Sequence, residues 1–353
     1  YSDIAAIHLQ DGNVVLDHTT IADSEFHGVY ALYGDLTLTN CVIDNCFAGY
    51  GVYFSGTGNA VSITDTIAQN CGRQGFYLNS DNITFNNNQA INNGSADYDA
   101  IFLNSNNWTS PPAGNSVTGN YLNWIRMHGT VTASMTLPAQ EVYYGNLTIG
   151  TGVTLTLAPG VIWKARSPYL YPFVVSDDAS FIVNGTESQP VYITSAADDT
   201  VGGDSNGDGD TTSPAWGDWR YIGNASTSEH VYIDLNYCSI RYGGYYSSYY
   251  GAITANGSGT IKLKNVNISE YSYAAVLAPN IRVECLWSTL SNSSATNYGI
   301  YGGQNSFIYD SSISNCQTGL YLGNGSRVKA CSIADNTNYG VNGSVVDARE
   351  CGW

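Results

Sequence analysis

The residues best suited to chemistry in this sequence lie in an acidic loop over residues 198–218. Side-chain oxygens at alternate positions of a glycine-rich bend are the arrangement with which the first half of an EF-hand loop holds Ca²⁺. So many carboxylates in one short loop repel one another without a cation, so we expect a structural Ca²⁺ here, a solvated acidic loop being the alternative. The EF-hand pattern is incomplete, because Ala215 stands where a bidentate glutamate would come. The candidate ligands are Asp198, Asp199, Asp204, Asn206, Asp208 and Asp210.

Tyrosine is the second residue type with a suggestive arrangement. The sequence contains 28 tyrosines, and several crowd one Gly/Ser-rich segment. Exposed tyrosine rings offer a stiff contact surface with one polar end, which suits a sugar or a protein partner. Two interpretations stay open: these residues are ordinary strand surface stabilised by ring stacking, or such a partner binds here. The candidates are Tyr242, Tyr245, Tyr246, Tyr249 and Tyr250.

The charge composition restricts the partners. With 12 Lys and Arg against 29 Asp and Glu, the net charge is −17. Nucleic acid and anionic membrane surfaces are expected to be repelled, because binding a phosphate backbone needs clustered basic residues. No run of about 18 apolar residues is present, so no membrane-spanning segment is expected. Ca²⁺ and neutral sugars remain as partners.

A short repeated phrase indicates the elements that position these residues. Gly-apolar-Tyr begins at Gly28, Gly51 and Gly75, and again at Gly299 and Gly319. The phrases follow one another at intervals of 23, 24 and 20 residues. Strands this short bury no face alone, so successive coils must stack about 4.8 Å apart with equivalent strands paired in parallel. The sequence predicts an all-β parallel β-helix, a solenoid with coils of 20–25 residues.

The alternation of strand side chains then assigns a direction to each residue of the phrase. The apolar neighbours of each tyrosine should point inward, and the tyrosines outward, stacked at intervals of about one coil. The outward tyrosines are Tyr30, Tyr53, Tyr77, Tyr301 and Tyr321.

Turn residues and cysteines also align between coils. Asn45, Asn70, Asn315 and Asn336 follow an aliphatic position at the turn and are expected to form an asparagine ladder that satisfies backbone groups. The eight cysteines include no CxxC pair, so a zinc site is not expected. Cysteines one coil apart lie within the usual range for a disulfide, and reduced core thiols are the alternative. The candidate pairs are Cys46 with Cys71 and Cys331 with Cys351.

A more specific order of segments covers residues 129–220. The runs Leu147–Val161, Phe181–Thr186 and Pro190–Thr194 precede the acidic loop, and Gly217-Asp-Trp follows it. This order is similar to the opening coils of large secreted bacterial or archaeal β-helix surface proteins, many of them without known enzyme activity. The Gly-apolar-Tyr repeat itself resembles the right-handed parallel β-helix of pectate-lyase-like proteins. The resemblance implies right-handed coils and a secreted or cell-surface location.

The segment order suggests three groups of coils. These are residues 1–115, residues 116–230 with the long loop at 198–218, and residues 231–353, expected to form one continuous solenoid. Neither end shows a polar cap, and uncapped solenoid ends expose strand edges. Two interpretations stay open: the chain is part of a longer array, or copies stack head to tail into a filament.

The resemblance also implies a possible enzyme function, because polysaccharide lyases and glycoside hydrolases share this fold. A lyase of this fold uses a Lys or Arg base beside calcium-bound carboxylates, and a hydrolase uses two facing carboxylates. Lys262, Lys264 and Arg282 form the best basic patch, with no matching Asp cluster expected in neighbouring coils; Asp44 and Asp65 are the carboxylate candidates. The groups expected to be isolated are Arg73 and His27. We therefore expect no catalysis and keep a lyase or hydrolase as the alternative.

Potential glycosylation sites support an extracellular location. Eleven Asn-X-Ser/Thr sequons occur, a mild excess for this composition. The sequence thus predicts an extracellular structural or adhesive β-helix whose partners are further copies of itself, neighbouring repeats or carbohydrate. A carbohydrate-binding adhesin that does not polymerise is a further alternative. The sequons begin at Asn82, Asn93, Asn107, Asn146, Asn184, Asn224, Asn256, Asn267, Asn292, Asn324 and Asn342.

Overall fold

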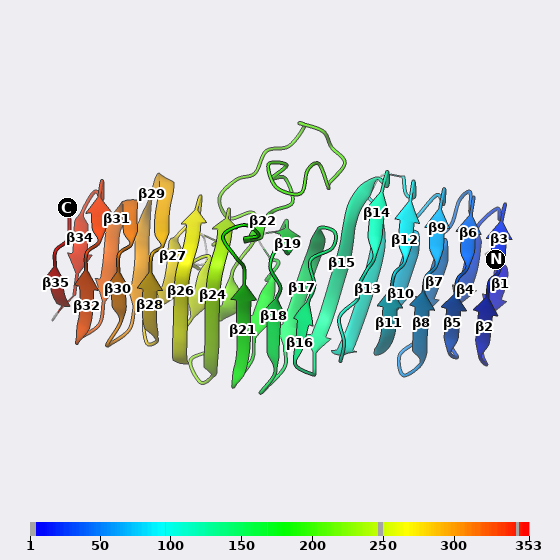
Figure 1. Ribbon diagram of the computed structural model, residues 1–353, viewed down its shortest axis with the longest axis horizontal. Coiled ribbons are helices and arrows are strands. Elements are labelled where there is room, and N and C mark those ends of the chain that lie inside the picture. Colours follow the sequence, from blue (N-terminus) through cyan, green and yellow to red (C-terminus); the bar gives the residue numbers. More distant parts are fainter. Residues whose placement is uncertain (1–4, 96, 168, 246–249, 344–345, 353) are drawn as a thin grey trace. The chain divides into compact units, whose positions relative to one another are not determined.

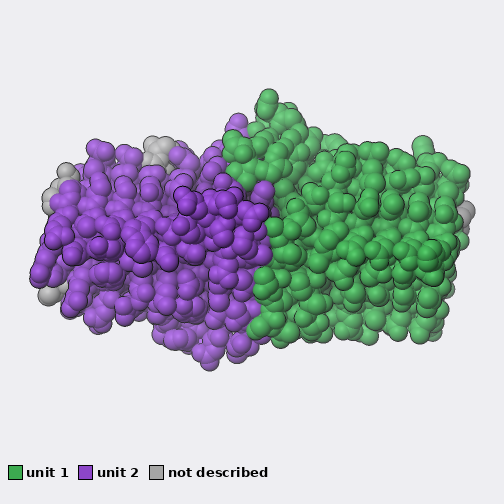
Figure 2. Space-filling model, viewed as in Figure 1, with its two compact units in different colours: residues 1–145, 199–212 green, residues 146–198, 213–353 purple. Residues whose placement is uncertain are grey.

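The computed structural model describes residues 5–95, 97–167, 169–245, 250–343 and 346–352. Within these ranges the chain forms strands and turns only, so no described helix is long and apolar enough to cross a membrane. The strands pair in parallel with their equivalents in the next coil, as predicted for a right-handed β-helix. The chain forms two compact units, unit 1 (1–145 and 199–212) and unit 2 (146–198 and 213–353), coloured separately in Figure 2.

Unit 1 consists of coils whose strands form three parallel ladders (Figure 1). The first ladder contains β1 (Ala5–Leu9), β4 (His27–Ala31), β7 (Val52–Ser55), β10 (Phe76–Asn79), β13 (Asp99–Trp108) and β15 (Leu122–Val131). The second ladder contains β2 (Val14–Asp17), β5 (Leu36–Thr39), β8 (Ala60–Thr64) and β11 (Asn82–Asn86). The third ladder contains β3 (Thr20–Ala22), β6 (Val42–Asp44), β9 (Ile67–Gln69), β12 (Gln89–Ile91) and β14 (Ser116–Thr118). Two further strands follow, β16 (Met135–Leu137) and β17 (Tyr143–Ile149), whose last four residues already belong to unit 2.

Unit 2 repeats the three-ladder plan with longer strands that take part in two ladders. Its first ladder contains β20 (Phe173–Val175), β23 (Ile222–Asn224), β25 (Ile253–Ala255), β27 (Ala274–Ala278), β29 (Thr289–Gly302), β31 (Ser312–Leu322) and β34 (Tyr339–Asn342). Its second contains β18 (Thr154–Leu157), β21 (Ala179–Asn184), β24 (His230–Arg241), β26 (Ser258–Ser269), β28 (Arg282–Leu286), β30 (Phe307–Tyr309), β32 (Ser326–Lys329) and β35 (Val346–Arg349). Its third runs from β19 (Ile162–Ala165) and β22 (Val191–Ser195) through parts of β24, β26, β29 and β31 to β33 (Ser332–Ala334).

The core of unit 1 is built from rows of identical or similar apolar residues. One row, fully buried, contains Val29, Val52, Phe76, Ile101 and Ile125. Because strand side chains alternate, the residue after each member points outward, and this places the tyrosines of the repeated phrase on the surface as predicted.

The glycine that opens the phrase is required for close packing between coils. A Cβ atom added to Gly51 would lie 2.6 Å from the carbonyl oxygen of Gly75 and 2.9 Å from the Cβ of Ala68. Both distances are shorter than van der Waals contact, so a larger residue would push two coils apart. The recurring glycine therefore reflects the space available at this turn.

A buried polar ladder satisfies the backbone at the turn before the third ladder. The Asn88 side chain is fully buried, and its Oδ1 accepts the N–H of Thr66 (3.0 Å) while its Nδ2 donates to the carbonyl of Ile63 (2.9 Å). The N–H of Asn88 donates to Oδ1 of Asn115 (2.9 Å) in the next coil. Each side-chain amide thus serves backbone groups of the preceding coil, which buried peptide groups require.

The asparagine ladder predicted from the turns is mostly wrong. Asn45, Asn70 and Asn315 have left-handed backbones with φ of 55°, 54° and 59°, and their side chains are exposed. Asparagine tolerates this conformation better than most residues, which explains its recurrence at the turn. Of the four predicted members, Asn336 takes the ladder role, because its Oδ1 accepts the N–H of Cys316 (3.1 Å).

Replacement of the buried amide tests the ladder. Asn88→Ala leaves the N–H of Thr66 and the carbonyl of Ile63 without these partners, so we expect the free energy of unfolding to fall by about 2–3 kcal/mol. Gln89→Ala removes an exposed amide from the adjacent position and should change the free energy of unfolding by less than about 0.5 kcal/mol. Urea unfolding followed by circular dichroism measures both, and equal effects would contradict the ladder role.

Candidate functional site

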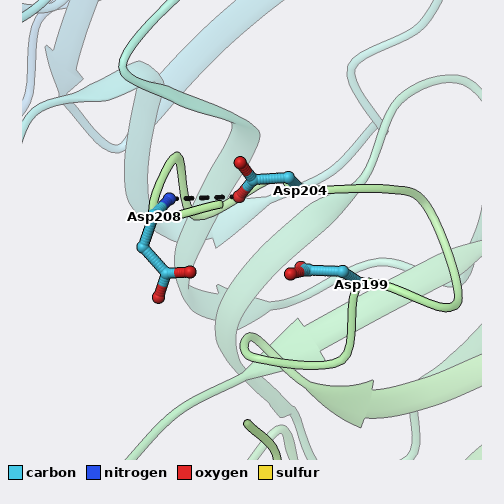
Figure 3. Close-up of side chains that lie close together, drawn as sticks. All are labelled: Asp199, Asp204 and Asp208. Carbon is cyan, nitrogen blue, oxygen red and sulfur yellow. Dashed lines mark hydrogen bonds between the residues drawn. The ribbon is translucent and has the colours of Figure 1, made fainter. Parts of the chain in front are cut away.

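The acidic loop gathers three of the predicted ligands in unit 1. Asp199, Asp204 and Asp208 lie close together, and one carboxylate oxygen of each lies within 4.8 Å of those of the other two (Figure 3). The carboxylate of Asp204 also accepts the backbone N–H of Asp208 (3.1 Å) and of Gly209 (2.9 Å). These two hydrogen bonds close the loop and orient the carboxylate.

Asn206 adds a buried amide beside this cluster. Its side chain is 6% exposed, and its Nδ2 donates to Oδ2 of Asp208 (2.8 Å). Among the described residues, Oδ1 of Asn206 and Oδ1 of Asp208 are buried without a hydrogen-bond donor. The loop therefore places buried oxygens, which ordinarily need a partner, next to three carboxylates.

Two of the predicted ligands lie outside the cluster. Asp198 is fully buried in unit 2, where its Oδ2 accepts the hydroxyl of Thr194 (2.6 Å) and lies 3.5 Å from Nη1 of Arg241. Asp210 is exposed and is not among the gathered carboxylates. The structure therefore does not bring these two residues to the cluster: Asp198 has polar partners inside unit 2, and Asp210 faces solvent.

The outward aromatic residues of unit 1 form a continuous row, which we call the tyrosine row: Tyr30, Tyr53, Tyr77 and Phe102. Successive ring centroids lie 4.8, 4.8 and 4.7 Å apart, and successive ring planes differ by 13°, 8° and 20°. All four side chains are half-buried. Since the rings cover one another's faces, the row presents ring edges and phenol hydroxyls to solvent.

The N-terminal part of the row has polar neighbours that were expected to be isolated. His27 is buried, stacks on Tyr30 at 4.9 Å, and its Nδ1 accepts the backbone N–H of Tyr50 (3.1 Å). The guanidinium of Arg73 lies over the rings of Tyr50 (5.2 Å) and Tyr98 (5.7 Å). Both cation–π contacts hold Arg73 against the aromatic face, so neither it nor His27 is isolated.

The C-terminal part of the row contains a charged cluster that sequence reasoning missed. Asp99 is 3% exposed; its Oδ1 accepts Nε1–H of Trp124 (2.5 Å), and its Oδ2 lies 3.4 Å from Nη1 of Arg126. The guanidinium of Arg126 lies over Phe102 (5.5 Å), and its Nε donates to Nε2 of His128 (2.7 Å). Burial raises the pKa of Asp99, and the charge of Arg126 partly opposes that rise. An alignment of consecutive coils would have been the signal for this cluster.

The basic patch of unit 2 is neutralised by carboxylates that were not expected beside it. Asp234 and Glu284 are the strand neighbours of Lys262 in the coils before and after it. A hydrogen bond with Tyr232 and these nearby charges raise the pKa of Lys262. A general base needs the opposite shift. The amine of Lys262 lies 5.3 Å from the ring centroid of Tyr232, and that of Lys264 lies 5.5 Å from the ring centroid of Trp287. Nη2 of Arg282 forms an ion pair with Oε1 of Glu284 (2.8 Å).

The two carboxylates considered for hydrolysis do not face one another. Asp44 ends β6, and its Oδ1 accepts Nδ2 of Asn70 (2.8 Å). Asp65 has a left-handed backbone (φ 50°) and precedes β9, which pairs with β6. They therefore lie at opposite ends of neighbouring short strands.

The predicted tyrosine loop of unit 2 is described in part. Tyr246 and Tyr249 lie outside the described residues. Tyr245 and Tyr250 exchange two backbone hydrogen bonds of 3.2 Å, and Tyr242 enters the loop with a left-handed φ of 64°.

Tyr250 joins an aromatic cluster on the first ladder of unit 2. Its ring lies 4.8 Å from that of Tyr221. The guanidinium of Arg220 lies over the rings of Tyr250 (4.7 Å) and Tyr171 (5.0 Å). The loop therefore contributes at least this tyrosine to a packed surface.

The four candidate disulfide cysteines lie as neighbours in pairs, with no bond drawn between them. Cys46 and Cys71 are both buried, and a hydrogen bond between the thiols, together with burial, raises the pKa of Cys71. The bridge between Ser332 and Gly352 places Cys331 beside Cys351 in the same register. Both disulfides stay predictions.

One predicted glycosylation site is incompatible with the folded chain. Asn93 is 1% exposed, and its Nδ2 donates to the carbonyl of Ala68 (2.8 Å). The side chain of Asn292 lies outside the described part. Exposed sequon side chains include Asn82, Asn184, Asn267 and Asn324, which stay candidates.

The buried carboxylate of Asp99 predicts a pH dependence. Folding raises the pKa of this carboxyl above its ordinary value of 3.8, so the folded protein favours the protonated form. As pH rises above 3.8, the free energy of unfolding therefore falls. Asp99→Asn cannot ionise. We therefore expect the variant to gain stability relative to the wild type as pH rises from about 4 to 7, measured by urea midpoints at each pH. If the difference in urea midpoint between variant and wild type stays constant over this pH range, or changes in favour of the wild type, the raised pKa of Asp99 would be refuted.

Comparison with known proteins agrees with this architecture. A family described as right handed beta helix region matches residues 2–137 and 251–351. Neither a curated protein nor a solved structure gives a significant match. The matched ranges make up more than half of the chain and contain the tyrosine row and the later coils of unit 2, so this chain belongs to the right-handed β-helix family.

Proposed function

We propose that this protein is an extracellular adhesive β-helix that binds carbohydrate chains along the tyrosine row of unit 1 without cleaving them. The observation that carries the proposal is the parallel stack of Tyr30, Tyr53 and Tyr77. The low charge content of 12% and the exposed sequons support the extracellular location.

The row suits an extended polymer because the hydroxyls of Tyr30, Tyr53 and Tyr77 recur once per coil. Coils are spaced by about 4.8 Å, which is close to the length of one sugar unit in an extended polysaccharide. A phenol hydroxyl both donates and accepts a hydrogen bond, as sugar hydroxyls do. Because the stacked rings are held rigidly, little side-chain entropy is lost when a ligand binds.

Cationic groups at two positions complement the row. Arg126 lies over Phe102 of the row, and Arg73 lies over Tyr50, whose ring is 5.1 Å from that of Tyr53 in the row, in a protein whose net charge is −17. Their guanidinium groups offer several N–H donors in a fixed plane, which suits ring hydroxyls and carboxylates. The row therefore has hydrogen-bond donors on rigid supports along its length.

The same face gives little support to catalysis. A glycoside hydrolase acts through two carboxyl groups placed on either side of the scissile bond. Asp99 is buried and accepts hydrogen bonds from Trp124 and Arg126, so it positions these residues and does not face a ligand. In unit 2, the raised pKa of Lys262 keeps its amine protonated.

A structural role is compatible with adhesion. Any β-solenoid has unpaired strand edges at its end coils, and such edges can pair with another copy. Head-to-tail stacking into a filament, or membership of a longer surface array, would display many tyrosine rows along one axis. Negative-stain images of the purified protein separate filaments from single particles.

The binding proposal is tested by removing hydroxyls while keeping the ring stack. One variant combines Tyr30→Phe, Tyr53→Phe and Tyr77→Phe. The control variant combines Tyr301→Phe with Tyr321→Phe, whose ring centroids lie 4.6 Å apart in unit 2. Affinity electrophoresis in gels containing β-glucan, mannan, pectin or alginate measures retardation. We expect the triple variant to lose at least about tenfold in affinity, since each hydrogen bond contributes about 0.5–1.5 kcal/mol.

The outcomes discriminate between the functions. Retardation of the wild type and the control, with loss in the triple variant, supports adhesion through the row. If no polysaccharide retards the wild type, or if the triple variant binds equally well, the proposal is wrong. Release of reducing ends or of products absorbing in the ultraviolet would replace it with a hydrolase or a lyase.

A further inference from the structure

We infer that residues 199–212 form a Ca²⁺ site and that the bound ion fixes this loop to the turn that precedes β15. Asp199, Asp204 and Asp208 supply the charge. The inference concerns a part of unit 1 that the proposed adhesive function does not use.

The first argument is the direction of the carboxylates. Their gathered oxygens lie within 4.8 Å of one another, and no described Lys, Arg or His forms an ion pair with Asp204 or Asp208. Like charges at this separation repel, and a divalent cation between them turns the repulsion into attraction.

The second, independent argument is the buried amide of Asn206. Asn206 is only 6% exposed, and the hydrogen bond from its Nδ2 to Oδ2 of Asp208 places its amide beside the cluster. Its Oδ1 has no donor within the described chain, and neither has Oδ1 of Asp208. Neutral and ionised oxygens buried without donors are the groups that a hard cation satisfies.

The donor set selects the ion. All the side chains that meet here offer oxygen, and the cluster includes no described histidine or cysteine, which soft metals prefer. Ca²⁺ accepts six to eight oxygen ligands in flexible geometry, with water completing the shell, whereas Mg²⁺ demands a near-ideal octahedron. A glycine-rich loop with left-handed backbones at Gly207 and Gly209 suits the more permissive ion.

The loop rests on unit 1 through two backbone contacts. The N–H of Asn123 donates to the carbonyl of Ser205 (2.8 Å). Gly207 packs so closely that a Cβ atom there would lie 2.0 Å from the carbonyl oxygen of Tyr121. Ser205 and Gly207 flank Asn206, so an ion that orders the loop also orders this contact.

The contact reaches the buried polar network of unit 1. Oδ1 of Asn123 accepts the N–H of Asn120 (3.0 Å), and Oδ1 of Asn120 accepts the N–H of Asn93 (2.9 Å). Ion binding therefore stabilises the turn at residues 119–123, where β15 begins. Loss of the ion should loosen this turn without unfolding the preceding coils.

Calorimetric titration of the EDTA-treated full chain with CaCl₂ and with MgCl₂ tests the inference. We expect one Ca²⁺ per chain, with a Kd between about 10⁻⁶ and 10⁻³ M, and weaker Mg²⁺ binding. Asp204→Asn and Asp208→Asn should each weaken Ca²⁺ binding by at least about tenfold, because each removes one ligand charge. Asp210→Asn removes the same charge from the same loop but outside the cluster, and should change the Kd by less than about threefold.

Two further readouts keep the test independent of misfolding. In EDTA, all three variants should melt within about 2 °C of the wild type, which shows that they fold. Hydrogen exchange of the wild type should slow at residues 119–123 and 203–209 when Ca²⁺ is added. Absence of Ca²⁺ binding, equal binding of Mg²⁺, or an equal loss in Asp210→Asn would overturn the inference, since each outcome indicates no site or only diffuse attraction by loop charge.

Discussion

The constraint on which this structure depends is the hydrogen-bonded register between successive coils. Each strand pairs in parallel with its equivalent in the next coil, so that Val52 lies beside Phe76 and Tyr53 beside Tyr77. A residue type that recurs once per coil therefore becomes a row along the axis. The buried apolar row, the polar ladder around Asn88 and the tyrosine row all result from this one geometric rule.

The candidate sites arise where the rule is exploited or interrupted. The tyrosine row exploits it, because repetition sets rigid hydroxyls at a regular spacing that a polymer can follow. The cluster of Asp99, Trp124 and Arg126 replaces a repeated aromatic position with charge. The acidic loop interrupts the coils and returns to unit 1 through Ser205 and Asn123. Regular coils thus supply the support, and irregular segments supply ionic chemistry.

Much of the fold could be predicted from the sequence because the repeated phrase reports both the coil length and the inward or outward direction of each residue. Tyr53 points outward between buried Val52 and Phe54 for this reason. The acidic loop was predicted in part. Asp198 and Asp199 are adjacent in sequence, yet the first is held by Thr194 and Arg241 and the second joins the cluster. Their separation depends on the path of the chain after β22, which no local pattern encodes.

Contacts between coils were harder to predict than the coils themselves. The Asp99 cluster needs an accurate offset between coils, and the pairing of β13 with β15 shifts register between Asp99 and Ile101. The asparagine ladder was assigned to Asn45 and Asn70, because a turn that needs a left-handed residue and a turn that buries an amide both select asparagine. Only the three-dimensional path separates these two uses.

The register is tested most directly by pairs of cysteines introduced on one outer face. Ser62 and Thr84 are direct neighbours in adjacent coils, whereas Asn82 pairs with Ala60 and is shifted along the strand from Ser62. Neighbours lie about 4.8 Å apart, within reach of a disulfide, and the shifted pair exceeds the limit of about 7 Å. After mild oxidation, peptide mapping should find a disulfide in the chain with Ser62→Cys and Thr84→Cys, and none between the new cysteines in the chain with Ser62→Cys and Asn82→Cys. A disulfide in the shifted pair, without one in the aligned pair, would contradict the register and with it the tyrosine row.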